Sequence, residues 1–438
     1  MEPTDTGVTQ IDPVSVDTFT VDPGTVDPVR GDPVKGNPNG RRWTWRRWVR
    51  PVYIIAYSLI VCVALPLIIW DAYSHQKYFK AIAWPTAGFG ALVAIGVTGY
   101  LMLNHIVYFS RPNQQRYILR ILLIVPIYSI NASFVLRWPK SAIYLDTICA
   151  CYKSFVLYCF LFYLIHYLTE HYDVENHLAK KEQIKSPVPF CCIKPGPNKR
   201  LLRRCRNGVL NFVVLGPILA LGLILAYSMD RNYTQGEFSP SGTWFWLTIV
   251  NILSQLWASY CLTVFYNATS EETYPLRALP QMLCVKFCIF ISFLQQVIIS
   301  LLVDRDVITS PEKWGIDKNG LSVVIHNFCL SIELAVLSFV QLFAFSHKPY
   351  MDKEPLDFRV SCRLFCDYTD LQRDIKDHSG KMMRDITTLG RNNEGSTTDE
   401  DDTSSHDEEK MKENWSSPDK DMFVYSKDIS DDSSTSEV

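Results

Sequence analysis

The sequence predicts an all-α fold: a polytopic membrane helix bundle with a seven-span core plus one extra N-terminal span. Long apolar runs follow one another from residue 51 to residue 345, and about 20 apolar residues suffice for a helix to cross the hydrocarbon layer. The flanking segments 1–50 and 346–438 are polar. Soluble domains rarely place several such runs in series, so the pattern argues against a soluble enzyme.

The N-terminal segment 1–50 is predicted to be a disordered cytosolic tail. Residues 1–40 repeat an Asp-Pro dipeptide and hold few apolar residues, and proline disfavours both helix and sheet. Tryptophan and arginine dominate residues 41–50, as expected at the cytosolic membrane interface. The extra first span follows at 51–70. A cleaved signal peptide is the alternative, but the leader is long and shows no clear small-residue cleavage site.

Seven further apolar runs make up the predicted core, residues 84–345. Their spans are 84–109, 117–138, 142–168, 208–227, 243–266, 281–303 and 321–345. Lysine and arginine favour cytosolic flanks. With the N-terminus in the cytosol, these flanks hold 17 such residues and the outer loops hold 7. Both termini are therefore predicted to be cytosolic, in the plasma membrane or in endosomal or vesicular membranes.

The segment that follows the last span, residues 346–390, is predicted to be a juxtamembrane region with an amphipathic helix. Leu371, Ile375, Met382 and Ile386 keep roughly helical spacing within it. Such a helix would lie on the membrane or on the underside of the bundle.

The chain ends in an acidic tail. Residues 391–438 carry 15 acids and 5 bases and are rich in serine and threonine, a composition typical of disorder. The last three residues, Ser436-Glu437-Val438, fit a PDZ ligand in which the terminal valine fills a pocket. A PDZ protein is therefore an expected partner, and a chance match of three residues is the alternative.

Two modification sites are predicted in the loops. Cys191 and Cys192 lie in the basic loop 169–207, where S-palmitoylation is expected and free thiols are the alternative. Asn232 begins an N-glycosylation sequon in a loop placed outside. The chain has 13 cysteines, mostly inside apolar runs, which predicts no disulfide framework.

Polar residues inside the predicted spans are the candidate site. Ionisable groups in lipid are costly and point to function. The ionisable candidates are Arg120, Asp146, Lys153, Lys286 and Glu333, and the polar companions are Asn131, Asn251, Gln255, Gln295, Gln296, His326 and Asn327. One interpretation is a polar cavity that accepts a solute. The other is hydrogen bonding that only joins helices, and Arg120 and Asp146 lie near enough to an interface to snorkel.

Four blocks of the sequence carry a family resemblance. They are Arg116 to Ser129, Ile143 to Thr147 with Cys151-Tyr152, Val285-Lys286 with Ser292 to Gln295, and Ile332-Glu333 with Lys348-Pro349-Tyr350. They resemble the transmembrane protein 184 family, which is related to the organic solute transporter alpha subunits. The resemblance covers about residues 41–386 and, by its opening and extra span, is most similar to the C-type branch. It implies an organic solute as ligand, and a small single-span partner subunit or a homo-oligomer.

The chain departs from the charge pattern that this resemblance implies. Asn131 and Asn327 stand where the family has Asp, Cys149-Ala150 where it has Arg-Glu, Lys153 where it has Glu, and Gly216 where it has Lys or Arg. Several intramembrane charges are lost and one is reversed. Because Lys153 and Glu333 are predicted at matched depth, we expect an ion pair between them that closes off the site.

The resemblance implies a transmembrane transporter of amphipathic organic solutes, working without ATP hydrolysis. The alternative is a non-transporting receptor or a trafficking or growth-regulatory scaffold that acts through its cytosolic tail. The sequence holds no phosphate-binding glycine loop, no paired histidines at metal spacing and no serine nucleophile elbow. We therefore expect no enzyme activity, no cofactor and no metal. The lipid bilayer is an expected partner and nucleic acid is not, since no strong basic balance is present.

Overall fold

The computed structural model describes residues 45–75, 79–181, 200–229, 242–309, 318–351, 356 and 358–392. Eight helices in these ranges are long and apolar enough to cross a membrane, and the described residues contain no strand. The predicted all-α polytopic bundle is therefore confirmed.

The first five helices follow the predicted spans closely. They are α1 (Trp45–His75), α2 (Phe79–Val107), α3 (Pro112–Leu122), α4 (Ile124–Arg137) and α5 (Ala142–Thr169). Helices α3 and α4 together form the third span, which is interrupted at Leu123. Proline has no backbone N–H, so Pro126 cannot donate to the carbonyl four residues earlier, and the helix is irregular at this point.

The remaining spans are α7 (Leu201–Met229), α8 (Thr243–Ala268), α9 (Ala278–Asp304) and α10 (Lys318–Ala344). Three shorter or peripheral helices accompany them: α6 (Val174–Lys180), α11 (Phe358–Phe365) and α12 (Thr369–Asn392). Helix α7 begins seven residues before the predicted span because arginines continue it, and arginine is a good helix former.

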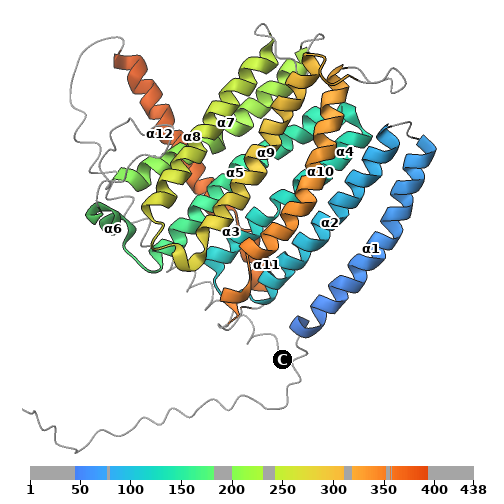
Figure 1. The fold of residues 1–438 in the computed structure, drawn as a ribbon. Helices are drawn as coiled ribbons and strands as arrows, with labels where there is room; N and C mark the ends of the chain where they lie inside the picture. Colours follow the sequence, from blue (N-terminus) through green and yellow to red (C-terminus); the bar gives the residue numbers. More distant parts are fainter. Residues whose placement is uncertain are drawn as a thin grey trace, which may run out of the picture. The chain divides into compact units, whose positions relative to one another are not determined.

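The spans are arranged as a bundle in which most consecutive spans pack against each other, and α10 also packs against spans far from it in the sequence (Figure 1). Helix α10 packs against α2, α4 and α9, whereas α5 packs against α3, α4, α7 and α9. Helices α3, α7 and α9 begin at one end of the bundle, where α11 also lies, and we call this end the tail side. The opposite end, where α4, α7 and α9 finish, is called the loop side.

Helix α1 contacts the bundle mainly through side chains that lie over α2. The Tyr53 hydroxyl donates to the Gly96 carbonyl at 3.1 Å, and the Tyr57 ring covers the Gly96 Cα, where a Cβ would collide with it. On the loop side, Arg137 of α4 forms a two-pronged ion pair with Asp71, with an Nε–Oδ2 distance of 2.8 Å. Small residues on α2 thus let the extra span approach.

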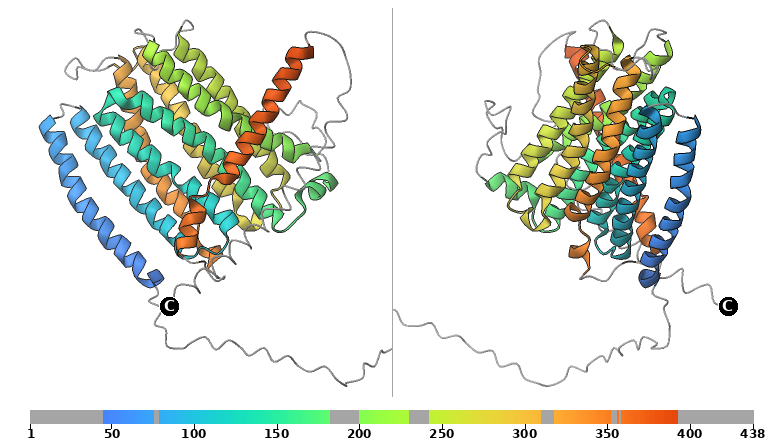
Figure 2. Two further views of the ribbon diagram at one scale, coloured as in Figure 1. Left: turned by 180° about the vertical axis from the view of Figure 1, so that it is seen from behind. Right: turned by 45° about the vertical axis from the view of Figure 1, so that its right-hand side comes forward.

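Helix α12 runs across the bundle instead of parallel to its spans (Figure 2). Leu371 and Ile375 are half-buried against the core, while Arg373 and Lys376 on the other face are exposed. The helix is therefore amphipathic and lies on the bundle itself.

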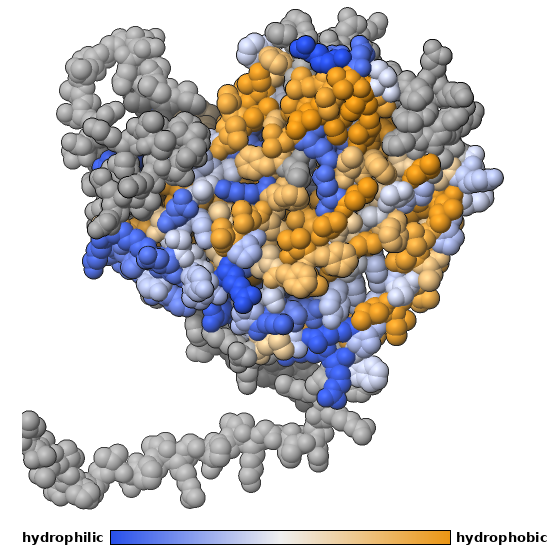
Figure 3. Space-filling model, viewed as in Figure 1, coloured by the Kyte–Doolittle hydropathy of each residue, from blue (hydrophilic) through white to orange (hydrophobic). Residues whose placement is uncertain are grey.

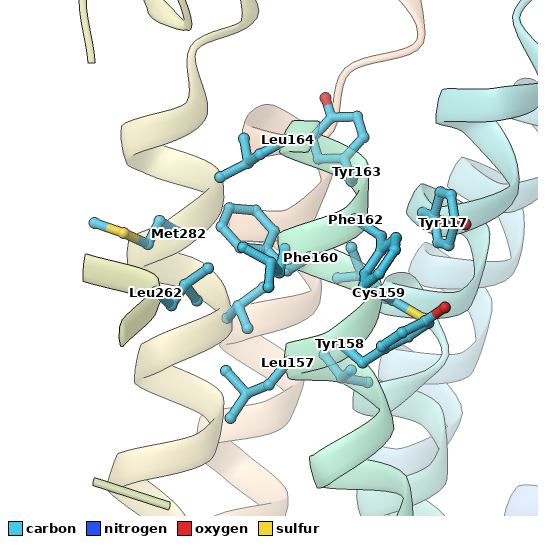
Figure 4. Close-up of a cluster of buried hydrophobic side chains, with 14 of the residues drawn as sticks. Tyr117, Leu157, Tyr158, Cys159, Phe160, Phe162, Tyr163, Leu164, Leu262 and Met282 are labelled. Atoms are coloured by element: carbon cyan, nitrogen blue, oxygen red, sulfur yellow. The ribbon is translucent and has the colours of Figure 1, made fainter. Parts of the chain in front are cut away.

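The buried core and the apolar outer surface of the bundle are both those expected of a protein in a lipid bilayer. Buried aromatic and aliphatic side chains fill the tail-side half of the bundle (Figure 4). Hydrophobic residues cover much of the outer face formed by α2, α8, α9 and α10, with some hydrophilic patches between them, and hydrophilic residues are most numerous at the end near α6 and α11 (Figure 3). An apolar surface of this extent suits a hydrocarbon solvent.

Candidate functional site

A cavity of about 160 Å³ lies inside the bundle, between α4, α5, α7, α8, α9 and α10. Its polar lining residues are Tyr128, Asn131, Asp146, Thr147, Lys153, Thr248, Asn251, Ser292, Gln296, Ser300, His326 and Asn327. All of them belong to the loop-side halves of their membrane spans. The cavity therefore occupies the loop-side half of the membrane domain.

Between the cavity and the tail side, the bundle is filled by packed side chains. Along α5, Lys153 is followed toward the tail side by Leu157, Phe160 and Leu164, each with no exposed surface. These side chains meet Leu262 of α8 and other buried residues in one cluster (Figure 4). Packed side chains of the described residues therefore lie between the cavity and the tail side.

The cavity joins an amide and an acid from neighbouring helices. Asn131 of α4 donates to the Asp146 carboxylate of α5 at 2.9 Å. The Asn131 side-chain oxygen is buried and accepts no hydrogen bond from the part of the chain that the structure describes. The His326 Nδ1 atom is likewise buried and has no hydrogen-bond partner among the described residues. Buried polar atoms are nearly always hydrogen-bonded, so both atoms suit contact with something inside the cavity.

Lys153 is the cavity's most unusual member. Its side chain is 8% exposed, and within the described ranges it forms no ion pair or hydrogen bond. It lies 11 residues from Ala142, about 16 Å along the helix at ~1.5 Å per residue. A charged ammonium at that depth costs about 3 kcal/mol or more without a counter-charge.

The positions at which the resemblance implies a departure from the family's charge pattern all lie at this cavity. Every one of them lines the cavity: Asn131, Cys149, Ala150, Lys153, Gly216 and Asn327. The implied departures therefore concern one space and are not scattered through the bundle.

Five of the predicted site residues do not line the cavity: Arg120, Gln255, Lys286, Gln295 and Glu333. The predicted ion pair between Lys153 and Glu333 is also wrong. Glu333 accepts a hydrogen bond from Gln295 at 2.7 Å, and no ion pair joins it to Lys153, although the structure describes both residues. The prediction required α5 and α10 to face each other, but α10 packs against α2, α4 and α9. Lys286 is also elsewhere, donating to the Thr263 hydroxyl between α9 and α8.

Arg120 does not snorkel to an interface. Its side chain has no exposed surface, and its guanidinium donates to the backbone carbonyls of Phe365 (3.3 Å) and Asp367. The Tyr368 ring lies over it, 4.5 Å from ring centroid to guanidinium carbon. Arg120 thus binds the segment between α11 and α12, and charge-assisted bonds of this kind are among the stronger ones.

Tail-side acids form a second polar cluster, which sequence reasoning missed. Arg116 pairs with Asp370 at 2.7 Å, and Asp374 binds Arg206 at 2.5 Å and Tyr158 at 2.9 Å. Burial raises the pKa of Asp374 above its ordinary value, although Arg206 and Tyr158 oppose this. The alternation of acids with apolar residues in α12 was the available signal.

Several predicted sites lie outside the described residues. They are the glycosylation site Asn232, the palmitoylation sites Cys191 and Cys192, and the PDZ-type terminus with Ser436 and Val438. In the described ranges, no group of three or more histidine, cysteine or acidic side chains could hold a metal ion.

Comparison with known proteins shows matches to a protein family and to curated proteins. Residues 83–350 match the sequence profile of the family described as organic solute transporter Ostalpha. A transmembrane protein 184 homolog of Dictyostelium discoideum is 30% identical over 287 residues, which cover 65% of this chain and 56% of the relative. The chain thus spans about half the length of that curated relative. No solved structure matches this chain.

Proposed function

Because the chain belongs to the organic solute transporter Ostalpha family, we propose that it binds an amphipathic organic solute in its loop-side cavity and carries it across the membrane. The family match covers α3 to α10, the helices that build the cavity, and nearly all of α2. The match to the transmembrane protein 184 homolog supports membership of this family, and the name of that relative identifies no solute.

The observation that carries the proposal is Lys153. A buried ammonium that finds no counter-charge in the described part of the chain is costly, unless a ligand supplies one. The cavity around it offers neutral donors from Asn251 and Gln296, which suit the oxygens of a carboxylate or a sulfate. The proposed solute therefore carries an anionic or strongly polar head group that lies against Lys153.

The size of the cavity limits what it holds in this conformation. A cavity of about 150 Å³ admits a molecule the size of benzene, and the volume here is about 160 Å³. The head group or one ring of an amphipathic solute fits, and a whole sterol does not. Transport of a larger solute thus requires the helices to rearrange, and in this mechanism no nucleotide is hydrolysed.

Uptake into vesicles containing the purified protein tests the proposal. Labelled bile-acid-like and sterol sulfate compounds should accumulate, and Lys153→Met should weaken their apparent affinity roughly 10- to 100-fold, the range for one charged hydrogen bond. Lys286→Met is the matched control, because this lysine lies outside the cavity. We expect it to leave affinity within about twofold, a surface-like effect.

Two outcomes would contradict the proposal. Equal loss in the Lys153 and Lys286 variants would mean that lysine removal only weakens the bundle. Absence of any solute-dependent flux or binding, with an active relative measured in parallel, would favour the receptor or scaffold alternative.

A further inference from the structure

Helix α12 is fastened to three different spans on the tail side. Arg116 of α3 pairs with Asp370 at 2.7 Å. Arg206 of α7 pairs with Asp374 at 2.5 Å, and Tyr158 of α5 donates to the same carboxylate at 2.9 Å. One surface helix therefore contacts α3, α5 and α7 through polar groups that are mostly shielded from solvent.

The contacts continue on both sides of Asp374. Before α12, Arg120 donates to the carbonyls of Phe365 and Asp367. One turn after Asp374, His378 is hydrogen-bonded to Asn211 of α7 at 2.7 Å. These contacts set the register of the helix on the bundle, so α12 is bound at a defined position.

Asp374 joins two helices that line the cavity. Its side chain is 14% exposed, and its two oxygens bind different spans, α5 through Tyr158 and α7 through Arg206. Near the cavity the same helices are in close contact, because a Cβ added at Gly216 would lie 3.1 Å from the Ser154 hydroxyl. Separation of α5 from α7 on the tail side would therefore have to break the contacts of Asp374.

We propose that α12 is a latch whose Asp374 holds α5 and α7 together and keeps the tail side of the cavity closed. The cavity opens toward the tail side when α12 leaves the bundle. This device controls access to the cavity and does not depend on which solute, if any, the cavity carries. A helix that merely rests on a rigid bundle would behave differently, since its release would leave α5 and α7 unchanged.

Two buried cysteines report on the two helices that Asp374 joins. Cys159 of α5 has no exposed surface and Cys205 of α7 is 2% exposed, and both lie in the tail-side halves of their helices. A polar maleimide should therefore label them slowly in the closed state. Labelling at each cysteine is followed by mass spectrometry in the full-length protein, together with hydrogen exchange of α12.

The test variant is Asp374→Ala. We expect faster exchange in α12 and roughly tenfold faster labelling of both cysteines, as loss of a charge-assisted bond predicts. The matched control is Asp377→Ala, because Asp377 is exposed on the same helix. We expect this control to match the wild type in both measurements.

Two further variants keep the test decisive if Asp374→Ala folds poorly. Tyr158→Phe removes only the α5 arm and should give a smaller rise at Cys159. Arg206→Asp alone should label fast, because it removes the ion pair. The double variant Arg206→Asp/Asp374→Arg forms the pair again with its charges exchanged and should label slowly.

Either of two results would overturn the latch. One is release of α12 while Cys159 and Cys205 stay protected, which would make α12 a passive attachment. The other is a helix α12 that stays protected in Asp374→Ala, which would mean that this carboxylate does not hold it.

Discussion

Three buried charged side chains differ in the groups that bind them. The Arg120 guanidinium reaches backbone carbonyls, and the Asp374 carboxylate receives donors from two helices. Lys153 faces the cavity, where the described residues supply no partner. The first two side chains bind other groups of the chain and so stabilise one arrangement of it, whereas Lys153 is the side chain that we propose meets a ligand.

Glu272 allows a prediction about pH at a single residue. Its carboxylate accepts from His177 at 2.6 Å and from Lys181 at 2.9 Å, and so holds α6 to the turn before α9. Burial alone would raise the pKa of Glu272, but hydrogen bonds from Lys181 and His177 outweigh it and leave that pKa below 4.5. A lowered folded-state pKa contributes stability that is present above the ordinary value and is lost as the pH falls through the lowered one.

Glu272→Gln should therefore lower the stability of the α6 region by about 1–2 kcal/mol at neutral pH. The difference from the wild type should shrink as the pH falls below 4.5. Hydrogen exchange of α6 at several pH values measures it. Glu271→Gln is the control, because that side chain is 87% exposed. A difference between variant and wild type that is independent of pH would contradict the ionic role of Glu272.

At the scale of elements, two glycines on α7 allow a matched prediction about packing. A Cβ at Gly208 would overlap the sulfur of Cys261 on α8, whereas a Cβ at Gly222 would meet Leu247 at an ordinary 3.7 Å. Gly208→Ala should destabilise the bundle by about 1–3 kcal/mol through overpacking. Gly222→Ala should be neutral or stabilising by up to ~1 kcal/mol, because alanine favours helix.

Thermal unfolding of both variants in one detergent measures this difference. A melting temperature that falls equally in both would mean that the loss comes from the added methyl group in general and not from the contact of α7 with α8. Gly208→Ser adds a second atom at the same place and should be worse than Gly208→Ala.

Apolar runs were sufficient to predict the spans, and they could not predict what the polar residues contact. Asn131, Asp146 and Lys153 were predicted as one group of candidates, and they do line one cavity. Glu333 was expected to pair with Lys153 from their matched depth and the reversed charge at Lys153, yet it is hydrogen-bonded to Gln295. Depth follows from position in a helix, whereas rotation and neighbour choice depend on tertiary packing, which a single sequence does not show.

The docking of α12 also shows that a sequence pattern predicts a helix but not the residues that it contacts. Helical spacing of Leu371 and Ile375 predicted an amphipathic helix, and both residues are half-buried against the core. The acids that fix its position, Asp370 and Asp374, look in sequence like any solvated charges. Their partners Arg116 and Arg206 lie 254 and 168 positions away (370 − 116 and 374 − 206), and no local pattern reports contacts of that kind.

At the scale of the whole molecule, the two ends of the bundle are built differently. The loop-side half contains the polar cavity, and the tail-side half contains a close-packed aromatic core crossed by α12. Eight spans bring the start of α1 and the end of α10 to the same side. An alternating mechanism would thus have to open the tail-side half, where α12 forms ion pairs with Arg116 and Arg206.

The orientation of this asymmetric bundle is the last prediction. We expect the tail side to face the cytosol, because α5 ends and α7 begins there, and the sequence that joins them, 169–207, holds nine lysines and arginines. The sequon at Asn232 then lies on the opposite side and should carry glycan, while the one at Asn267, an exposed residue near the tail-side end of α8, should not. Glycosidase shifts of Asn232→Gln and Asn267→Gln decide between the two orientations. Glycan on Asn267 would place the tail side, and with it the α12 latch, outside the cytosol, where no cytosolic factor could release it.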